Sequence, residues 1–259
     1  MLITLTTDFG YQDAFVGIMK GVILRINPEA RIVDLTHGIR PQDILAGALT
    51  LRHAVGYFPC GTIHLAVVDP GVGSARRPLL VESAGSYFIG PDNGIFSLIP
   101  VNEDPTRIVE LSNSEYHLKP TSSTFHGRDI FAPVAGHLSL GIEPQCFGSL
   151  RDSMMQITLP KIVRSAREIV GEIVYVDGYG NLFTNIVERD LTVLPRDELT
   201  IACGPVTIRG LTKSYASARA GDYVALINSW GMLEIALRNG SAQRAVGLSV
   251  GDQLKLTWG

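Results

Sequence analysis

The chain has 259 residues, of which 46% are hydrophobic and 18% are charged, and its formal net charge at pH 7 is −3. This length accommodates about two domains with a substantial core, and the composition argues against an intrinsically disordered protein. Because nucleic-acid binding calls for basic surfaces, the slightly negative charge gives no reason to expect a nucleic-acid partner.

The sequence also lacks the marks of a membrane, secreted or metal-binding protein. No apolar run approaches the ~18 residues of a membrane span, and the N-terminus MLITLTTDFG has no basic region or cleavage site. The cysteines, Cys60, Cys146 and Cys203, are widely spaced and odd in number, which is typical of reduced thiols. No histidine pair has metal-ligand spacing. We therefore expect a cytoplasmic protein with no membrane association, no metal and no cofactor.

Strand and helix patterns alternate along the first half of the chain. Apolar and β-branched runs predict strands at 2–7, 31–35, 63–68, 79–83, 87–89 and 107–111. Apolar residues at helical spacing predict helices at 13–27, 41–57 (with Pro41 in its first turn) and 128–140. A β-α-β-α-β order of this kind indicates a mostly parallel sheet.

The second half changes character. Short strands separated by glycine-rich turns are predicted at 168–176, 182–187, 198–202, 223–228, 232–236 and 253–258. This pattern indicates a small antiparallel sheet or barrel. The expected fold is α/β, with an N-terminal α/β domain at 1–155, a linker at 156–166 and a smaller antiparallel, barrel-like β domain at 167–259.

The stretch HLAVVDPGVGSARR at 64–77 is the strongest local candidate for a functional site. A buried strand ends at Asp69, and open α/β sheets bind ligands at the carboxyl ends of their strands. Gly71 and Gly73 would let backbone approach a ligand, and Arg76 or Arg77 could hold an anion. For an isolated motif of this kind, a strand-to-loop turn with an Asp cap and a surface ion pair is the favoured interpretation, and it is the other candidate segments of the chain that support a functional site.

Three further polar segments are candidates for the same site. His126 precedes a predicted helix, whose dipole would favour a neutral imidazole able to accept a proton; a capping or packing histidine is the alternative. In the second half, DGYGN at 177–181 and NSWG at 228–231 place polar side chains beside glycines. Ordinary hairpin turns would also explain these two segments.

An ordered set of motifs covers nearly the whole chain. They are TTDFG at 6–10, MKGVI at 19–23, IVDLTHGIRPQDI at 32–44, FPCGTIHLAVVDPGVGSARR at 58–77, GPDNG at 90–94, TFHGRDIFAPVA at 124–135, YGNLFTNI at 179–186 and NSWGMLEIA at 228–236. Together they resemble the S-adenosylmethionine (SAM) hydroxide adenosyltransferases, the SAM-hydrolase branch of the superfamily that includes fluorinase and chlorinase. The resemblance implies an α/β domain followed by a smaller β domain. It also implies a homotrimer with its site at the subunit interface, and the reaction of SAM with water to give adenosine and L-methionine.

The resemblance places an Asp-Arg-His catalytic set on Asp69, Arg76 and His126. Asp69 and His126 would orient and deprotonate water, and Arg76 would stabilise the developing hydroxide. Which of Asp69 and His126 takes the proton stays open, and Arg77 is the alternative to its neighbour Arg76.

The resemblance also implies a set of substrate-binding residues. Asp8 would accept both ribose hydroxyls, although a helix cap is its alternative role. The methionine amine and carboxylate would be held by Asp177, Asn181 and Ser229. Tyr179 stands where the family usually has Phe, so it would stack with an added hydroxyl. Trp230, Glu234 and backbone near Leu237 would bind adenine; Glu234 could instead face solvent.

Two other functions remain open at this stage. A halide-using adenosyltransferase of the same superfamily is disfavoured by the Asp-Arg-His set, which halogenating relatives replace. A non-catalytic adenosine or SAM sensor would keep Asp8, Asn181 and Ser229 useful while Asp69, Arg76 and His126 became dispensable.

Overall fold

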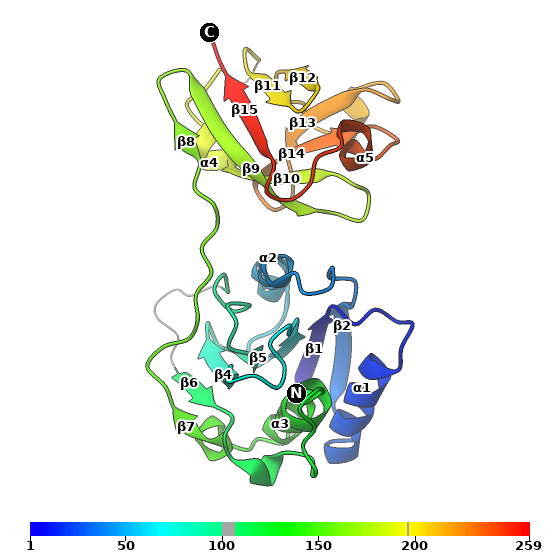
Figure 1. Ribbon diagram of the computed structural model, residues 1–259, viewed down its shortest axis with the longest axis vertical. Helices are drawn as coiled ribbons and strands as arrows, with labels where there is room; N and C mark the ends of the chain where they lie inside the picture. Colours follow the sequence, from blue (N-terminus) through cyan, green and yellow to red (C-terminus); the bar gives the residue numbers. More distant parts are fainter. Residues whose placement is uncertain (100–106, 196) are drawn as a thin grey trace. The chain divides into compact units, whose positions relative to one another are not determined.

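The computed structural model describes residues 1–99, 107–195 and 197–259, which divide into two compact units. The first unit is Met1–Ile157 and the second is Thr158–Gly259. Each has its own β-sheet (Figure 1). The boundary between them lies within the segment 156–166, where the sequence predicts a linker.

The first unit is built on a seven-stranded mixed sheet in the order β2-β1-β3-β5-β4-β6-β7. Its strands are β1 (Leu2–Thr7), β2 (Arg31–Thr36), β3 (Ile63–Val67), β4 (Pro78–Ser83), β5 (Ser86–Pro91), β6 (Arg107–Glu110) and β7 (Ser149–Leu150). Neighbours among β2, β1, β3 and β5 are parallel, and β4, β6 and β7 add antiparallel pairs. The α/β prediction for this half is confirmed, with a larger antiparallel share than the pattern suggests.

The first two helices of this unit begin later than the sequence suggests. Helix α1 (Phe15–Ile26) starts two residues after its predicted position. Helix α2 (Ile44–Ala54), followed by a 3₁₀ turn at Val55–Tyr57, starts after Asp43, whose side chain accepts a hydrogen bond from the Ala46 amide at 2.9 Å. Because Asp43 satisfies an orphan amide of the first turn, it fixes the helix start, and the prediction that Pro41 lies in that turn is wrong.

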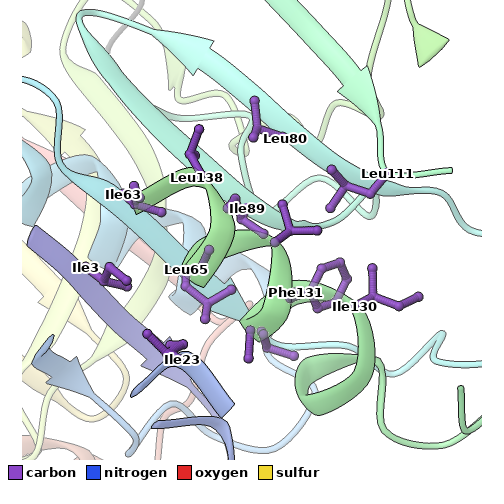
Figure 2. Close-up of a cluster of buried hydrophobic side chains, with 14 of the residues drawn as sticks. Ile3, Ile23, Ile63, Leu65, Leu80, Ile89, Leu111, Ile130, Phe131 and Leu138 are labelled. Atoms are coloured by element: carbon purple, nitrogen blue, oxygen red, sulfur yellow. The ribbon is translucent and has the colours of Figure 1, made fainter. Parts of the chain in front are cut away.

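The predicted helix at 128–140 has two parts. A π-helical turn, Gly127–Phe131, leads into α3 (Ala132–Ser139). Its apolar side chains pack with the sheet and α1 into one buried cluster, in which Phe131 and Leu138 lie beside Ile63, Leu65 and Ile89 of the strands (Figure 2). This packing fixes the segment that follows His126.

The second unit is an antiparallel, nearly closed sheet in the order β12-β11-β15-β9-β10-β14-β13, with β8 paired to β9. Its strands are β8 (Val163–Arg164), β9 (Glu168–Val176), β10 (Leu182–Val187), β11 (Thr200–Cys203), β12 (Val206–Arg209), β13 (Tyr223–Ile227), β14 (Met232–Leu237) and β15 (Gln253–Thr257). Two short helices, α4 (Glu188–Leu191) and α5 (Ala242–Val246), accompany them. The barrel-like prediction is confirmed; β8, β12 and both helices were not predicted.

Among the residues that the structure describes, no helix has the length and apolar character needed to cross a membrane.

His64 makes the stability of the first unit sensitive to acid. It lies fully buried in β3, its Nδ1 2.8 Å from the Thr4 hydroxyl and its ring stacked on Phe88. Burial lowers the pKa of His64 to about 4. The unfolded chain therefore takes up a proton below the ordinary histidine pKa, whereas the folded chain does not. The free energy of unfolding should fall by about 1.4 kcal/mol per pH unit as the pH drops from 6.5 towards 4.

Urea unfolding at several pH values checks this expectation. His64→Gln, which cannot titrate, should show a shallower dependence by about that slope. The remaining histidines, including His53, whose pKa burial also lowers to about 4, contribute equally to both proteins. Parallel pH dependences would contradict the assignment.

Candidate active site

The order in which strands are added to the first sheet reverses between β1 and β3. From β1 it passes through α1 to β2 on one side, and then through α2 to β3 on the other side of β1. Asp8 follows directly after β1 and Asp69 comes two residues after β3. A reversal of this kind leaves a crevice outside the strand ends, where open α/β sheets bind ligands.

Asp69, Arg76 and His126 meet at this edge. Arg76 Nε donates to Asp69 Oδ1 at 2.9 Å, and Arg76 Nη2 donates to Asp69 Oδ2. The same Nη2 lies 2.8 Å from His126 Nδ1. The Asp69 and Arg76 side chains are only 5% and 8% exposed, so this ion pair lies largely out of water. The structure thus joins the three residues that the sequence proposes as a catalytic set.

Arg76 and Arg77 have separate partners. Arg77 pairs with Asp92 through Nε at 2.8 Å and also donates to the Ser153 carbonyl at 3.0 Å. It therefore ties the end of the first unit to the turn after β5. Of the two adjacent arginines, Arg76 is the one that contacts Asp69 and His126.

Gly73 brings the Asp69 loop against the segment that carries His126. Its φ is +78°, and an added Cβ would lie 2.3 Å from the Ser123 carbonyl oxygen. Only glycine fits this contact without a shift in backbone. The sequence-based expectation was close approach to a ligand; in the structure the close approach of Gly73 is to Ser123.

A pocket of about 480 Å³ opens beside these residues. Asp69 and His126 are part of its wall, whereas Arg76 is not among the lining residues. Three phenylalanines, Phe9, Phe15 and Phe125, supply an apolar wall and pack edge to face with ring centroids 5.2–6.0 Å apart. The sequence does not predict this aromatic wall, because each of the three phenylalanines taken alone is typical of a core or turn residue.

The environment of His126 favours its neutral form. Burial, and then the charge of Arg76, lower the pKa of His126, while Asp69 and Asp129 act in the opposite direction. The sequence predicts a neutral ring because His126 precedes a helix. In the structure, burial and the charge of Arg76 are the main causes of the lowered pKa. Asp129 is itself buried and held by Arg128 and by the Ser122 amide at 2.8 Å.

Asp8 does not cap helix α1, so that alternative role is wrong. The residue before the helix is Ala14, and no side chain caps it. Asp8 Oδ2 instead accepts a hydrogen bond from the Gln42 amide at 2.8 Å. The carboxylate keeps further acceptor capacity, and its side chain is partly exposed at the strand ends.

In the second unit, Asp177 organises the turn between β9 and β10. Its Oδ1 accepts from the amides of Tyr179 and Asn181, both at 2.9 Å, and its Oδ2 accepts from Asn181 Nδ2 at 3.0 Å. These residues and Leu237 line an open pocket of about 760 Å³. The ordinary turn that the sequence offers as the alternative explanation of this segment is therefore present, and its residues also line a pocket.

A second pocket of about 360 Å³ adjoins this one and shares Asp177 and Tyr215 with it. Ser229 and Glu234 line it. Glu234 is fully buried, so the alternative that it faces solvent is wrong. Burial raises the pKa of the Glu234 carboxyl, opposed by hydrogen bonds from Tyr215 and Asn228. Tyr215, which donates to Glu234 at 2.7 Å, was not predicted because its segment carries no recognisable motif.

Trp230 lies outside the lining of both pockets. Its ring contacts Tyr175 and Phe183, with centroids 5.0 and 5.1 Å away. The structure therefore groups six of the seven second-unit candidates around the two pockets and places Trp230 in a neighbouring aromatic cluster.

Tyr215→Phe should destabilise the second unit by about 1–3 kcal/mol, because it removes a hydrogen-bond donor from the buried Glu234 carboxyl. The loss should be smaller near pH 5, where the carboxyl, whose pKa is raised, is more often protonated and less costly to bury. Urea unfolding monitored by tryptophan fluorescence checks both statements. Equal stabilities of variant and wild type at neutral pH would refute them.

Within the described part of the chain, no group of three or more His, Cys, Asp or Glu side chains is placed to hold a metal ion.

Comparison with known proteins decides the family. The profile of the SAM hydroxide adenosyltransferase N-terminal domain matches residues 3–148, and that of the C-terminal domain matches residues 171–255. The chain belongs to the SAM hydroxide adenosyltransferase family. The resemblance inferred from the sequence motifs is thereby confirmed.

Several known proteins are similar to the chain over most of its length. A protein of Salinispora tropica named (R)-S-adenosyl-L-methionine hydrolase is 35% identical over 99% of the chain and 98% of its own length. One of the same name from Methanocaldococcus jannaschii is 34% identical over 99% and 96%. A fluorinase from Actinoplanes is 27% identical over 91% and 90%. The crystal structure of an uncharacterized conserved protein from Thermotoga maritima matches with a TM-score of 0.90 at 34% identity, covering 99% of the chain and all of that protein.

Proposed function

We propose that the chain hydrolyses S-adenosyl-L-methionine to adenosine and L-methionine. The observation that carries this proposal is the Asp69–Arg76–His126 set, with Asp69 and His126 in the wall of a partly aromatic pocket at the strand ends. It is supported by full-length relatives that are named as SAM hydrolases and are more similar to the chain than the fluorinases are.

The proposed chemistry is an in-line displacement at the ribose C5′. The oxygen of water forms a bond to C5′ while the C5′–S bond breaks, and its electron pair stays on sulfur. A cationic sulfonium thereby leaves as the neutral thioether of methionine and needs no general acid. What the site must supply is one oriented water, a proton acceptor and exclusion of bulk solvent. No step requires a cofactor, so we propose that none is used.

The substrate contacts remain proposals. Asp8, at the end of β1, would accept the ribose hydroxyls. Asp177, Asn181 and Ser229 would hold the methionine zwitterion, whose burial would be costly without such partners. Tyr179 would stack on the substrate, and Trp230, Glu234 and backbone near Leu237 would bind adenine. Trp230 has the weakest support, because it lies outside the lining of both pockets.

Incubation of the purified chain with SAM in halide-free buffer tests this function. Equimolar adenosine and methionine are expected, with no dependence on added chloride or fluoride. Because the relatives are named for the R epimer, both sulfur epimers should be assayed separately. Recovery of intact substrate from both would refute hydrolysis, and a 5′-halogenated product formed only with halide would favour the halide-using alternative.

We also propose a homotrimer with its site at the subunit interface, on the family resemblance alone. Light scattering of the purified protein tests the assembly, and a monomeric mass would contradict it. A cytoplasmic location is proposed because Cys60, Cys146 and Cys203 are free thiols, two of them exposed.

A further inference from the structure

Three phenylalanines form an aromatic corner in the wall of the pocket at the strand ends. Phe9 follows β1, Phe15 is the first residue of α1, and Phe125 lies just before the π-helical turn. The planes of the three rings meet in pairs at 64°, 73° and 79°, so the rings stand steeply to one another instead of stacking. Aromatic faces carry negative charge density, and proteins bind organic cations between rings that are arranged as such walls. The corner therefore has the form of a cation-binding surface.

The rings of the corner are accessible from the pocket. Phe15 is 42% exposed, and Phe9 and Phe125 are only partly buried at the edge of the core cluster. An aromatic ring left in water at a pocket carries a free-energy cost that a ligand recovers when it covers the ring. The corner is thus a surface for a ligand and not an interior part of the core.

The charges around the corner are compatible with a bound cation. Arg128 lines the pocket, but it is paired with the buried carboxylate of Asp129. Its guanidinium also lies over the ring of Phe125, with Cζ 5.3 Å from the ring centroid. One ring of the corner therefore already attracts a cation in the folded chain, and the rings of Phe9 and Phe15 remain for a ligand.

We propose that this aromatic corner recognises the positive charge of the SAM sulfonium. The inference rests on the proposed function and names the feature of the substrate that the first unit selects. In the proposed displacement the attacking oxygen, C5′ and sulfur lie in line, and the sulfur is one bond from C5′. A pocket that holds the attacking water beside Asp69 therefore also receives the sulfur. Phe9 and Phe15 line that same pocket.

An attraction of this kind acts on the substrate and not on the products. When the C5′–S bond breaks, its electron pair stays on sulfur, which becomes a neutral thioether. The rings then lose the charge that they attract, so they bind SAM more strongly than methionine and adenosine. Because this charge already declines towards the transition state, the corner contributes to substrate affinity and discrimination, not to acceleration of the chemical step. It selects SAM against the thioether that lacks the S-methyl group and its charge.

Calorimetry with two unreactive analogues tests charge recognition without turnover. One analogue carries an ammonium group in place of the sulfonium, and the other is S-adenosylhomocysteine, whose sulfur is uncharged. The wild type should prefer the cationic analogue. Phe15→Leu should lower that preference by about two- to thirtyfold, the range of one cation–π contact, because leucine supplies an apolar side chain but no ring.

Val72→Ala is the matched control, because it alters the wall of the same pocket without removing a ring. It should leave the preference for the cationic analogue unchanged, and Phe15→Tyr, which keeps a ring, should largely retain it. Equal losses of affinity for both analogues in Phe15→Leu would make Phe15 an ordinary apolar contact and overturn the proposal.

Fluorinated phenylalanines at position 15 provide a second test that keeps the shape of the ring while withdrawing charge density from its faces. Each added fluorine should weaken binding of the cationic analogue and raise KM for SAM, with kcat nearly constant. Binding of the uncharged analogue should stay the same. An affinity for the cationic analogue that is independent of fluorination would overturn the proposal. Binding that follows the fluorine count in a protein that forms no adenosine would support charge recognition and refute the proposed hydrolysis.

Discussion

Replacing Asp69 with asparagine is expected to lower turnover by about 10²- to 10⁴-fold, the usual contribution of a positioned general base. Asparagine keeps the size of the side chain and one acceptor oxygen, but it cannot take up the proton of water. Substrate binding should change little, because Asp69 is proposed to contact the attacking water rather than SAM itself. Single-turnover kinetics, with SAM binding measured separately by calorimetry, check the two expectations.

Asp92→Asn is the matched control for Asp69→Asn. Asp92 is also a largely buried loop carboxylate that pairs with an arginine, in its case Arg77. Removing either charge leaves a partner arginine uncompensated, so both variants should lose stability, by up to about 3–5 kcal/mol where the pair is well buried. Only Asp69→Asn should lose turnover. Equal turnover of Asp69→Asn and wild type would remove Asp69 from the chemistry.

Replacing Arg76 with lysine should lower turnover by at least about 10²-fold although the positive charge is kept. A lysine amine cannot reproduce the planar fork that binds both oxygens of Asp69 and also donates to His126 Nδ1. Small displacements of catalytic groups have costs of this order. Because Arg76 does not line the pocket, the loss should appear in kcat, with KM nearly constant.

Arg77→Lys tests whether the effect belongs to Arg76 itself. The two arginines are adjacent, but Arg77 binds Asp92 and the Ser153 carbonyl. Its replacement should weaken the attachment of the end of the first unit and leave turnover close to that of the wild type. A larger loss of turnover in Arg77→Lys than in Arg76→Lys would contradict the site described above.

The fold was predictable wherever apolar residues recur in the sequence with a clear periodicity. The strands at 168–176 and 182–187 have the predicted bounds, because alternating or continuous apolar runs end there at turn residues. Helix starts were less accurate. The first turn of α2 depends on one side chain, Asp43, which outcompetes the preference of Pro41 for that position. The π-helical turn after His126 has no sequence signal, because it results from packing of Phe131 and its neighbours.

For the site, the sequence supplied the residue types but not their contacts. Asp69 was identifiable because it ends a buried strand. The choice between Arg76 and Arg77 required the path of the loop, which depends on the contact of Gly73 with Ser123. The aromatic wall and Tyr215 come from segments that only folding brings to the pockets. The contact that distinguishes Arg76 from Arg77 could not be predicted for the same reason, since it joins Arg76 to His126, 50 positions away in the chain.

Hydrolysis of SAM in ¹⁸O-labelled water is the most direct test of attack by water at C5′. Mass spectrometry of the products should find one ¹⁸O in adenosine, at the 5′ position, and none in methionine. Unlabelled adenosine, or label in methionine, would contradict the displacement at C5′ on which the assignment of Asp69, Arg76 and His126 depends.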